Sequence, residues 1–179
     1  MEQEKNPIYG HDVLEFVTVA LEFCTFVEKA NELELFDFSD KATKLLPLLY
    51  LKATLLPDLE EEDDELECSV TEEMYERVRT GLAHLLGEQD SYLETFHPDM
   101  PYSDTPIVAF ISESLADVYQ DTGNFISLFR QGNEELMQAA VARCRQNFQT
   151  FWGQQLLNAL KALHQVRYNS EDIFEKSDY

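Results

Sequence analysis

Three acidic residues, Glu113, Asp117 and Asp121, follow one another at intervals of four. On a helix this spacing stacks the carboxylates along one face, which is how bundle helices present ligands to divalent cations. At about 100° per residue, Glu113 lies nearly opposite the apolar stripe and the two aspartates lie progressively nearer to it. One hypothesis is therefore a hydrolase that uses Mg²⁺ or Mn²⁺, with these acids as metal ligands and Glu15 nearby. The other interpretation is a solvated or hydrogen-bonded flank, the commoner role of helical acids.

A line of amides near the C-terminal end of the chain is the second candidate. Asn147, Gln154 and Asn158 recur at spacings of seven and four, beside Phe151 and Trp152. Amides on a partly apolar helix face serve either as hydrogen-bonding struts between helices or as the polar end of a ligand pocket. The sequence leaves both interpretations open.

No complete catalytic motif accompanies these candidates. The four histidines are isolated, and the chain has no nucleophile elbow, glycine-rich phosphate loop or zinc-ligand spacing. The catalytic residues are therefore unknown and no cofactor is expected, apart from Mg²⁺ or Mn²⁺ under the hydrolase hypothesis. An enzyme is the less favoured interpretation.

The acidic series belongs to the clearest helical pattern in the chain. Thr105 and Pro106 form a helix start signal, and the helix is expected to end near Gly132. Between them, apolar residues alternate at spacings of three and four, as in a helix packed against other helices: Val108, Ile111, Leu115, Val118, Thr122, Phe125 and Phe129.

Similar periodicity predicts helices over roughly 11–31, 39–56, 71–87 and 133–167. The helix over 39–56 is apolar around most of its circumference and is expected deep in the bundle, kinked or divided at Pro47. The last helix would be about 50 Å long if straight, and Gly153 allows a bend. The segment 87–102 is expected to be a loop, and no strand pattern competes. We predict an all-α, single-domain bundle of about five to six helices over 11–168, with an N-terminal arm (1–10) and a flexible C-terminal tail (169–179).

Composition and charge restrict the possible partners. Hydrophobic residues make up 44% of the chain, too many for a disordered protein, and the net charge is −22. This charge excludes nucleic acid and opposes binding to an anionic membrane. An acidic loop (58–67) is expected to be a solvated linker or a docking strip for a basic partner, and it lacks the glycine that a calcium loop needs.

The cysteines and the N-terminus indicate a cellular location. Cys24, Cys68 and Cys144 are odd in number and contain no CxxC pair, and the first ten residues lack the features of a secretory signal. No apolar run is long enough to span a membrane. We expect a cytoplasmic protein.

The letters ESLADV are weakly similar to the second metal motif of the all-helical nucleotide pyrophosphohydrolases, Glu-x-x-Asp. Here Ser114 stands three residues before Asp117, and the glutamate falls one position early, at Glu113. Glu72, Glu73 and Glu76 match the first motif of that class by letters, but they begin a helix.

A broader resemblance covers residues 9–168. The segments EFVTVALEFC, KLLPLLYLKATLLP, TEEMYERVR, YSDTPIVAFISESLADVYQD and NFQTFWGQQLLNALKALH resemble the bacterial family described as domain of unknown function 5063. The resemblance implies no activity and no catalytic residues. It marks positions typical of the pattern, which are Tyr102, Asp104, Glu113, Asp117, Tyr119, Asp121, Trp152 and Asn158. With the amide line, these give the ligand-binding candidates Asp104, Tyr119, Asn147, Trp152 and Asn158.

The favoured hypothesis is a binding or interaction module that binds a protein partner or associates with itself, without contacting nucleic acid or membrane. The divalent-metal-dependent hydrolase is the alternative. A third hypothesis, an acidic mimic of nucleic acid, rests on charge alone and ranks last.

Overall fold

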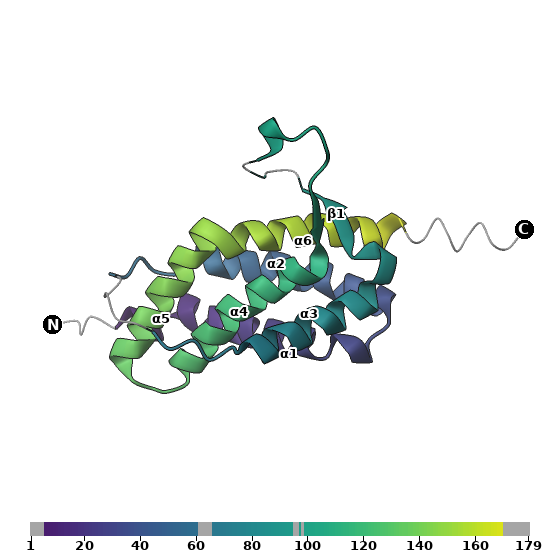
Figure 1. Cartoon of the computed structure of the whole chain (residues 1–179). Coiled ribbons are helices and arrows are strands. Elements are labelled where there is room, and N and C mark those ends of the chain that lie inside the picture. The colour runs from purple at the N-terminus through teal and green to yellow at the C-terminus, as the bar shows by residue number, and fades with distance from the viewer. Residues whose placement is uncertain (1–5, 61–65, 95–96, 98, 170–179) are drawn as a thin grey trace, which may run out of the picture.

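The computed structural model describes residues 6–60, 66–94, 97 and 99–169. Within these residues the chain is an all-α bundle, as predicted, with one small antiparallel sheet (Figure 1). No described helix is both long and apolar enough to cross a membrane. The elements are α1 (His11–Glu28), α2 (Leu35–Thr54), α3 (Glu72–Leu86), β1 (Ser91–Leu93), β2 (Val108–Phe110), α4 (Ile111–Phe129), α5 (Glu134–Asn147) and α6 (Gly153–Asn169).

Helix α4 lies at the centre of the bundle. It packs against α1, α3, α5 and α6, and its apolar stripe is buried from Ile111 to Phe125, as the spacing predicts. Helix α2 lies at the edge instead, with Leu48, Leu51 and the C-cap residue Leu55 exposed by 41–52%. The prediction of a deeply buried second helix is therefore wrong, because no described helix covers its outer face.

Proline does not divide α2. The helix is continuous from Leu35 to Thr54, and Pro47 lies on its exposed side. A proline inside a helix leaves the carbonyl four residues earlier, here Thr43, without its usual N–H donor. At an exposed position water can bond that carbonyl, so the helix tolerates the proline.

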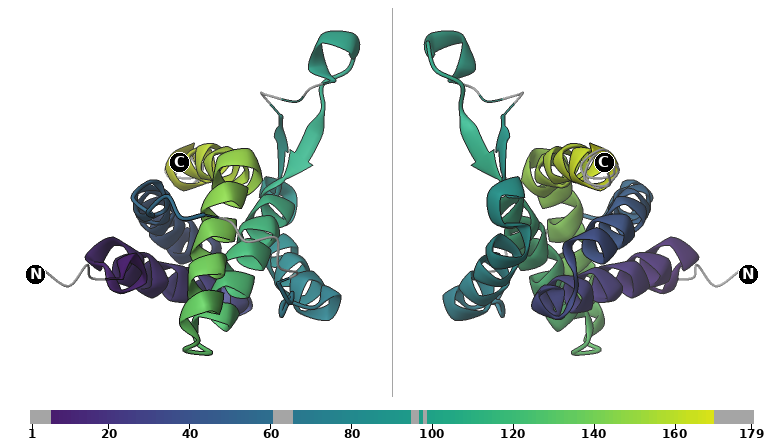
Figure 2. Two further views of the ribbon diagram at one scale, coloured as in Figure 1. Left: turned by 90° about the vertical axis from the view of Figure 1, so that its left-hand side faces the viewer. Right: turned by 90° about the vertical axis from the view of Figure 1, so that its right-hand side faces the viewer.

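The segment between α3 and α4 differs from the prediction. The helix expected from Thr105 begins only at Ile111, and the residues before it form β2, which pairs with β1 in the register Ser91↔Phe110, Tyr92↔Ala109 and Leu93↔Val108. We call residues 91–110 the hairpin. Its strands rise from the bundle, and the short 3₁₀ helix Met100–Tyr102 lies at its far end (Figures 1 and 2). The predicted end of α3 is confirmed at Gly87, which has a φ of 53°.

The last predicted helix is two helices at an angle. A π-helical turn, Phe148–Trp152, separates α5 from α6, and the chain changes direction there (Figure 2). The segment is therefore not a single straight helix of about 50 Å, and the bend that Gly153 allows is found beside it. Trp152 is fully buried at this turn; its Nε1 donates to the carbonyl oxygen of Cys144 at 3.1 Å, and its ring stacks on Phe16.

The chain before α1 packs onto the bundle. Ile8 is fully buried, and the Tyr9 hydroxyl donates to Oε1 of Glu134 at 3.1 Å. The packed region thus begins before residue 11, the predicted boundary. Asp58, at the start of the acidic loop, pairs with Arg145 at 2.7 Å; residues 61–65 of that loop and 170–179 of the predicted tail lie outside the described residues.

Candidate functional site: the base of the hairpin

The hairpin is fixed to the bundle by a buried aspartate. Asp90 is 7% exposed, and its carboxylate accepts the backbone N–H of Ser112 at 2.8 Å and the Ser112 hydroxyl at 2.7 Å. The N-cap residue of α4, Phe110, makes no side-chain cap bond. Asp90 therefore caps α4 from the other side of the hairpin, and its negative charge suits the positive end of the helix dipole.

A second layer of hydrogen bonds fixes the inner face of the hairpin. The hydroxyls of Tyr92 and Ser114 are 2.9 Å apart. Glu94 is 9% exposed and accepts from Nδ2 of Asn158 at 2.9 Å, while Oδ1 of Asn158 accepts from Gln154 at 3.0 Å. Two amides of the predicted line, Gln154 and Asn158, therefore act as a strut between α6 and the hairpin.

The outer face of the hairpin has the opposite chemistry. Because side chains alternate along a strand, Leu93, Val108 and Phe110 point away from the face that carries Tyr92. They are exposed by 59%, 55% and 40%. We call these three residues the outer face: an apolar surface on a rigidly anchored support, with no described element covering it.

A groove lies between β1 and α6. Its volume is about 540 Å³, and the three residues of β1 form one wall. The described lining contains four amide side chains and one charged side chain, Lys161. The α6 wall consists of Asn158, Lys161, Ala162, Gln165, Val166 and Asn169, and Gln89 also lines the groove.

The acids of α4 lie as the helical projection predicts. Glu113 is exposed and the two aspartates are half-buried. Asp117 accepts from the Tyr75 hydroxyl at 2.9 Å, and Asp121 accepts from Nδ2 of Asn147 at 2.5 Å. Burial is the main cause that raises the pKa of both aspartates above the ordinary value, and the hydrogen bonds oppose this shift.

These acids do not gather as a ligand set. Among the described residues, one group of three or more His, Cys, Asp or Glu side chains has its possible ligand atoms within 4.8 Å of one another. That group does not include Glu113, Asp117 or Asp121. The Tyr75 and Asn147 bonds use one oxygen of each aspartate for packing between helices. The Mg²⁺ or Mn²⁺ site therefore stays a prediction.

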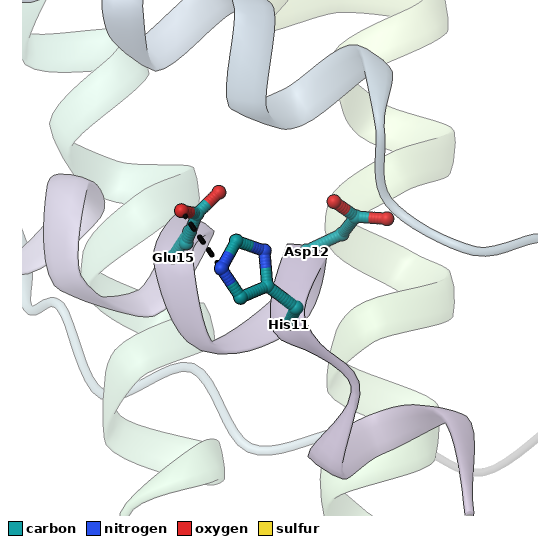
Figure 3. A group of neighbouring side chains, drawn as sticks. All are labelled: His11, Asp12 and Glu15. Carbon is teal, nitrogen blue, oxygen red and sulfur yellow. Dashed lines mark ion pairs between the residues drawn. The ribbon is translucent and has the colours of Figure 1, made fainter.

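The group that does gather in the described part of the chain contains His11, Asp12 and Glu15 at the start of α1, shown in Figure 3. Nε2 of His11 lies 3.3 Å from Glu15, and Nζ of Lys52 lies 2.5 Å from the other Glu15 oxygen. The positive end of a helix dipole and a paired lysine both disfavour a cation here. We interpret the group as a surface ion pair.

Substituting Asp121 by asparagine is expected to remove a pH-dependent penalty. A buried carboxyl whose folded-state pKa is raised destabilises the fold when it is charged, so its contribution improves as the pH falls through that pKa toward about 3.9, the ordinary value. The substituted amide would keep an acceptor for Asn147 and carry no charge. Urea unfolding between about pH 4 and 7.5 should show a flatter profile for Asp121→Asn, with stability at pH 7 unchanged or slightly higher. Glu113→Gln, on the exposed face of α4, is the control; equal profiles for Asp121→Asn and wild type would contradict the expectation.

The remaining candidates lie in separate parts of the fold. The Tyr119 hydroxyl donates to Oε1 of Glu28 at 2.8 Å and joins α4 to α1. Asn147 and Trp152 lie around the α5–α6 turn. Asp104 is exposed on the hairpin between the 3₁₀ helix and β2. Of the five ligand-binding candidates, the structure places Asn158 at the groove and Asp104 on the hairpin, and the others elsewhere.

Sequence reasoning missed Asp90, Tyr92 and Glu94. Asp90 and Tyr92 lie in a segment expected to be a loop, and Glu94 finds its partner 64 residues away. The sequence carries almost no signal for β2, because Val108, Ala109 and Phe110 are all apolar and form a strand of only three residues. The helix start signal at Thr105 also favoured a helix in this segment.

Fold and site together define an all-α bundle with an anchored hairpin that presents an apolar face. The chain belongs to the family described as domain of unknown function (DUF5063), whose model matches residues 7–169. It is similar to the crystal structure of protein BF1032 from Bacteroides fragilis, with 46% identity, a TM-score of 0.81 and coverage of 90% of this chain and 96% of that one. A comparison with curated proteins found no match.

Proposed function

We propose that this protein is a binding module that holds a basic protein partner on its hairpin. The observation that carries the proposal is the outer face, because three large apolar side chains are 40–59% exposed there. Their support is fixed to α4 and α6 through Asp90, Tyr92 and Glu94. A preorganised apolar surface loses little conformational entropy on binding, which favours affinity.

The charge around the hairpin specifies the partner. No lysine or arginine occurs between Arg79 and Arg130. Four exposed acids lie within that stretch, before, on and after the hairpin: Glu88, Asp99, Asp104 and Glu113. A partner with an apolar patch flanked by basic residues complements this surface, and opposite charges speed its encounter. Self-association through the hairpin is disfavoured, because two copies present like charges to each other.

The test uses a photo-crosslinking amino acid at Val108 in the full chain, with the same amino acid at Leu51 of α2, 52% exposed, as the control position. A basic protein captured from native cells at Val108 and absent at Leu51 is then purified. Its affinity is measured by titration calorimetry at two salt concentrations.

The double variant Val108→Ser/Phe110→Ser should weaken that binding at least tenfold, because burial of each side chain is worth about 1.5–3 kcal/mol. Raising the salt should weaken it further. Leu51→Ser should change nothing. Captured proteins that are acidic, or an affinity indifferent to the double variant, would overturn the proposal.

A further inference from the structure

The backbone of β1 has a side that faces the groove and that β2 does not use. In the ladder, the N–H of Glu94 donates to the carbonyl of Ile107 and the N–H of Ile111 to the carbonyl of Asp90, both at 2.8 Å. In an antiparallel pair, alternate residues direct their N–H and C=O toward the partner strand. Asp90, Tyr92 and Glu94 therefore face β2. Ser91 and Leu93 direct their backbone groups the other way.

The groove lies on that open side. Ser91 and Leu93 both line it, and α6 forms the opposite wall. An exposed strand edge is a template for an added strand, and bordering pockets select its side chains. The edge and the groove together form a site for an extended peptide.

We infer that the basic partner inserts an extended segment that pairs with β1 as a third strand and lies between the hairpin and α6. The inference rests on the proposed function and adds its binding mode. Alternate residues of the segment would enter the groove, and the others would extend the outer face.

The lining of the groove selects the chemistry of this segment. The groove contains amides, Ala162, Val166 and one cation, Lys161. Inward residues of the segment should therefore be small or amide-bearing, and its outward residues apolar. Its basic residues belong at the two ends, near Glu88 before the hairpin and Asp99 and Asp104 beyond β1.

Two substitutions at one position separate backbone pairing from side-chain packing. Leu93→Ala and Leu93→Pro both remove the leucine side chain, but only proline also removes the outward N–H. The ladder to β2 does not use that N–H, and edge strands tolerate proline at such positions. Amide exchange of Glu94 and Ile111 reports whether the ladder survives in each variant.

The probe is a phage-displayed library of random decapeptides selected on the wild-type protein. The selected peptides should have basic ends and bind the Leu93→Pro variant at least tenfold more weakly than Leu93→Ala. Two sets of peptides are then compared, N-methylated at odd-numbered or at even-numbered amides. The set in which the methylated amides face β1 should lose binding, and the other set should keep it. Failure to select any peptide, acidic peptides, equal affinity for the two variants, or equal effects of the two methylated sets would overturn the inference. If the captured protein needs Val108 and Phe110 but binds both Leu93 variants equally, the proposed function stands and strand addition does not.

Discussion

Replacing Gly153 by alanine is expected to destabilise the protein by about 2–3 kcal/mol, the upper part of the range of about 1–3 kcal/mol for overpacking a core. An added Cβ would lie 2.5 Å from the carbonyl oxygen of Phe148 and 2.8 Å from its ring. The oxygen belongs to the π-helical turn, so relief requires the backbone between α5 and α6 to move. That movement would disturb Trp152, which is fully buried beside it. Urea unfolding monitored by fluorescence of this single tryptophan measures both effects.

Gly81→Ala is the matched control. Gly81 lies within α3, and a Cβ there meets nothing within 4 Å. Alanine is a better helix former than glycine by about 1 kcal/mol, so this substitution should stabilise the protein. The two substitutions are therefore expected to change the free energy of unfolding in opposite directions. A Gly153→Ala protein as stable as wild type would show that the turn adapts and that the close approach is not required.

Replacing Asp90 by alanine is expected to cost about 2–4 kcal/mol and to release the base of the hairpin. The substitution removes both acceptors of Ser112, and bonds to a charged group are worth about 1.5–3 kcal/mol each. The N–H of Ser112 would remain buried without a partner. Amide exchange should therefore accelerate at Ser112 and in the strands, and partner binding should weaken with it. Asp90→Asn, which keeps one acceptor, should show an intermediate loss.

Thr71→Ala provides the comparison for an ordinary helix cap. Thr71 caps α3 locally by accepting the N–H of Met74 at 3.2 Å, at an exposed position. Its loss should cost about 1 kcal/mol and leave the hairpin amides protected. If Asp90→Ala costs no more than Thr71→Ala and leaves the hairpin amides protected, Asp90 is only a cap and does not position the hairpin.

The sequence predicted the parts of the fold that depend on long periodic patterns. The stripe from Ile111 to Phe129 spans five turns of helix, and its 3.6-residue period is compatible only with an α-helix. The exposure of Glu113 relative to Asp117 and Asp121 follows from the same geometry. The hairpin could not be predicted in this way, because strands of three residues give almost no alternation. Val108 also fits the helical spacing by coincidence.

The site depends on contacts between distant segments, which local patterns do not encode. Asn158 was a candidate because amides on an apolar helix face need partners, but nothing in the sequence identified Glu94 as that partner. The cap of α4 shows the same limit: Thr105 has the chemistry of a cap, but α4 begins only at Ile111, and Asp90 makes the bond from 22 residues before Ser112. The sequence therefore predicts that a helix needs a cap, but it does not identify the capping residue when that residue is distant in the chain.

The two ends of the hairpin meet at the bundle, since Asp90 and Ile111 share a backbone hydrogen bond of 2.8 Å. The hairpin therefore leaves the bundle and returns to it at the same place. Its length and composition can vary while α3 and α4 keep their packing. Closing a longer loop across fixed ends adds little entropy cost, about 0.6 kcal/mol per doubling. Relatives can therefore diverge in this segment and acquire different recognition properties on an unchanged helical scaffold.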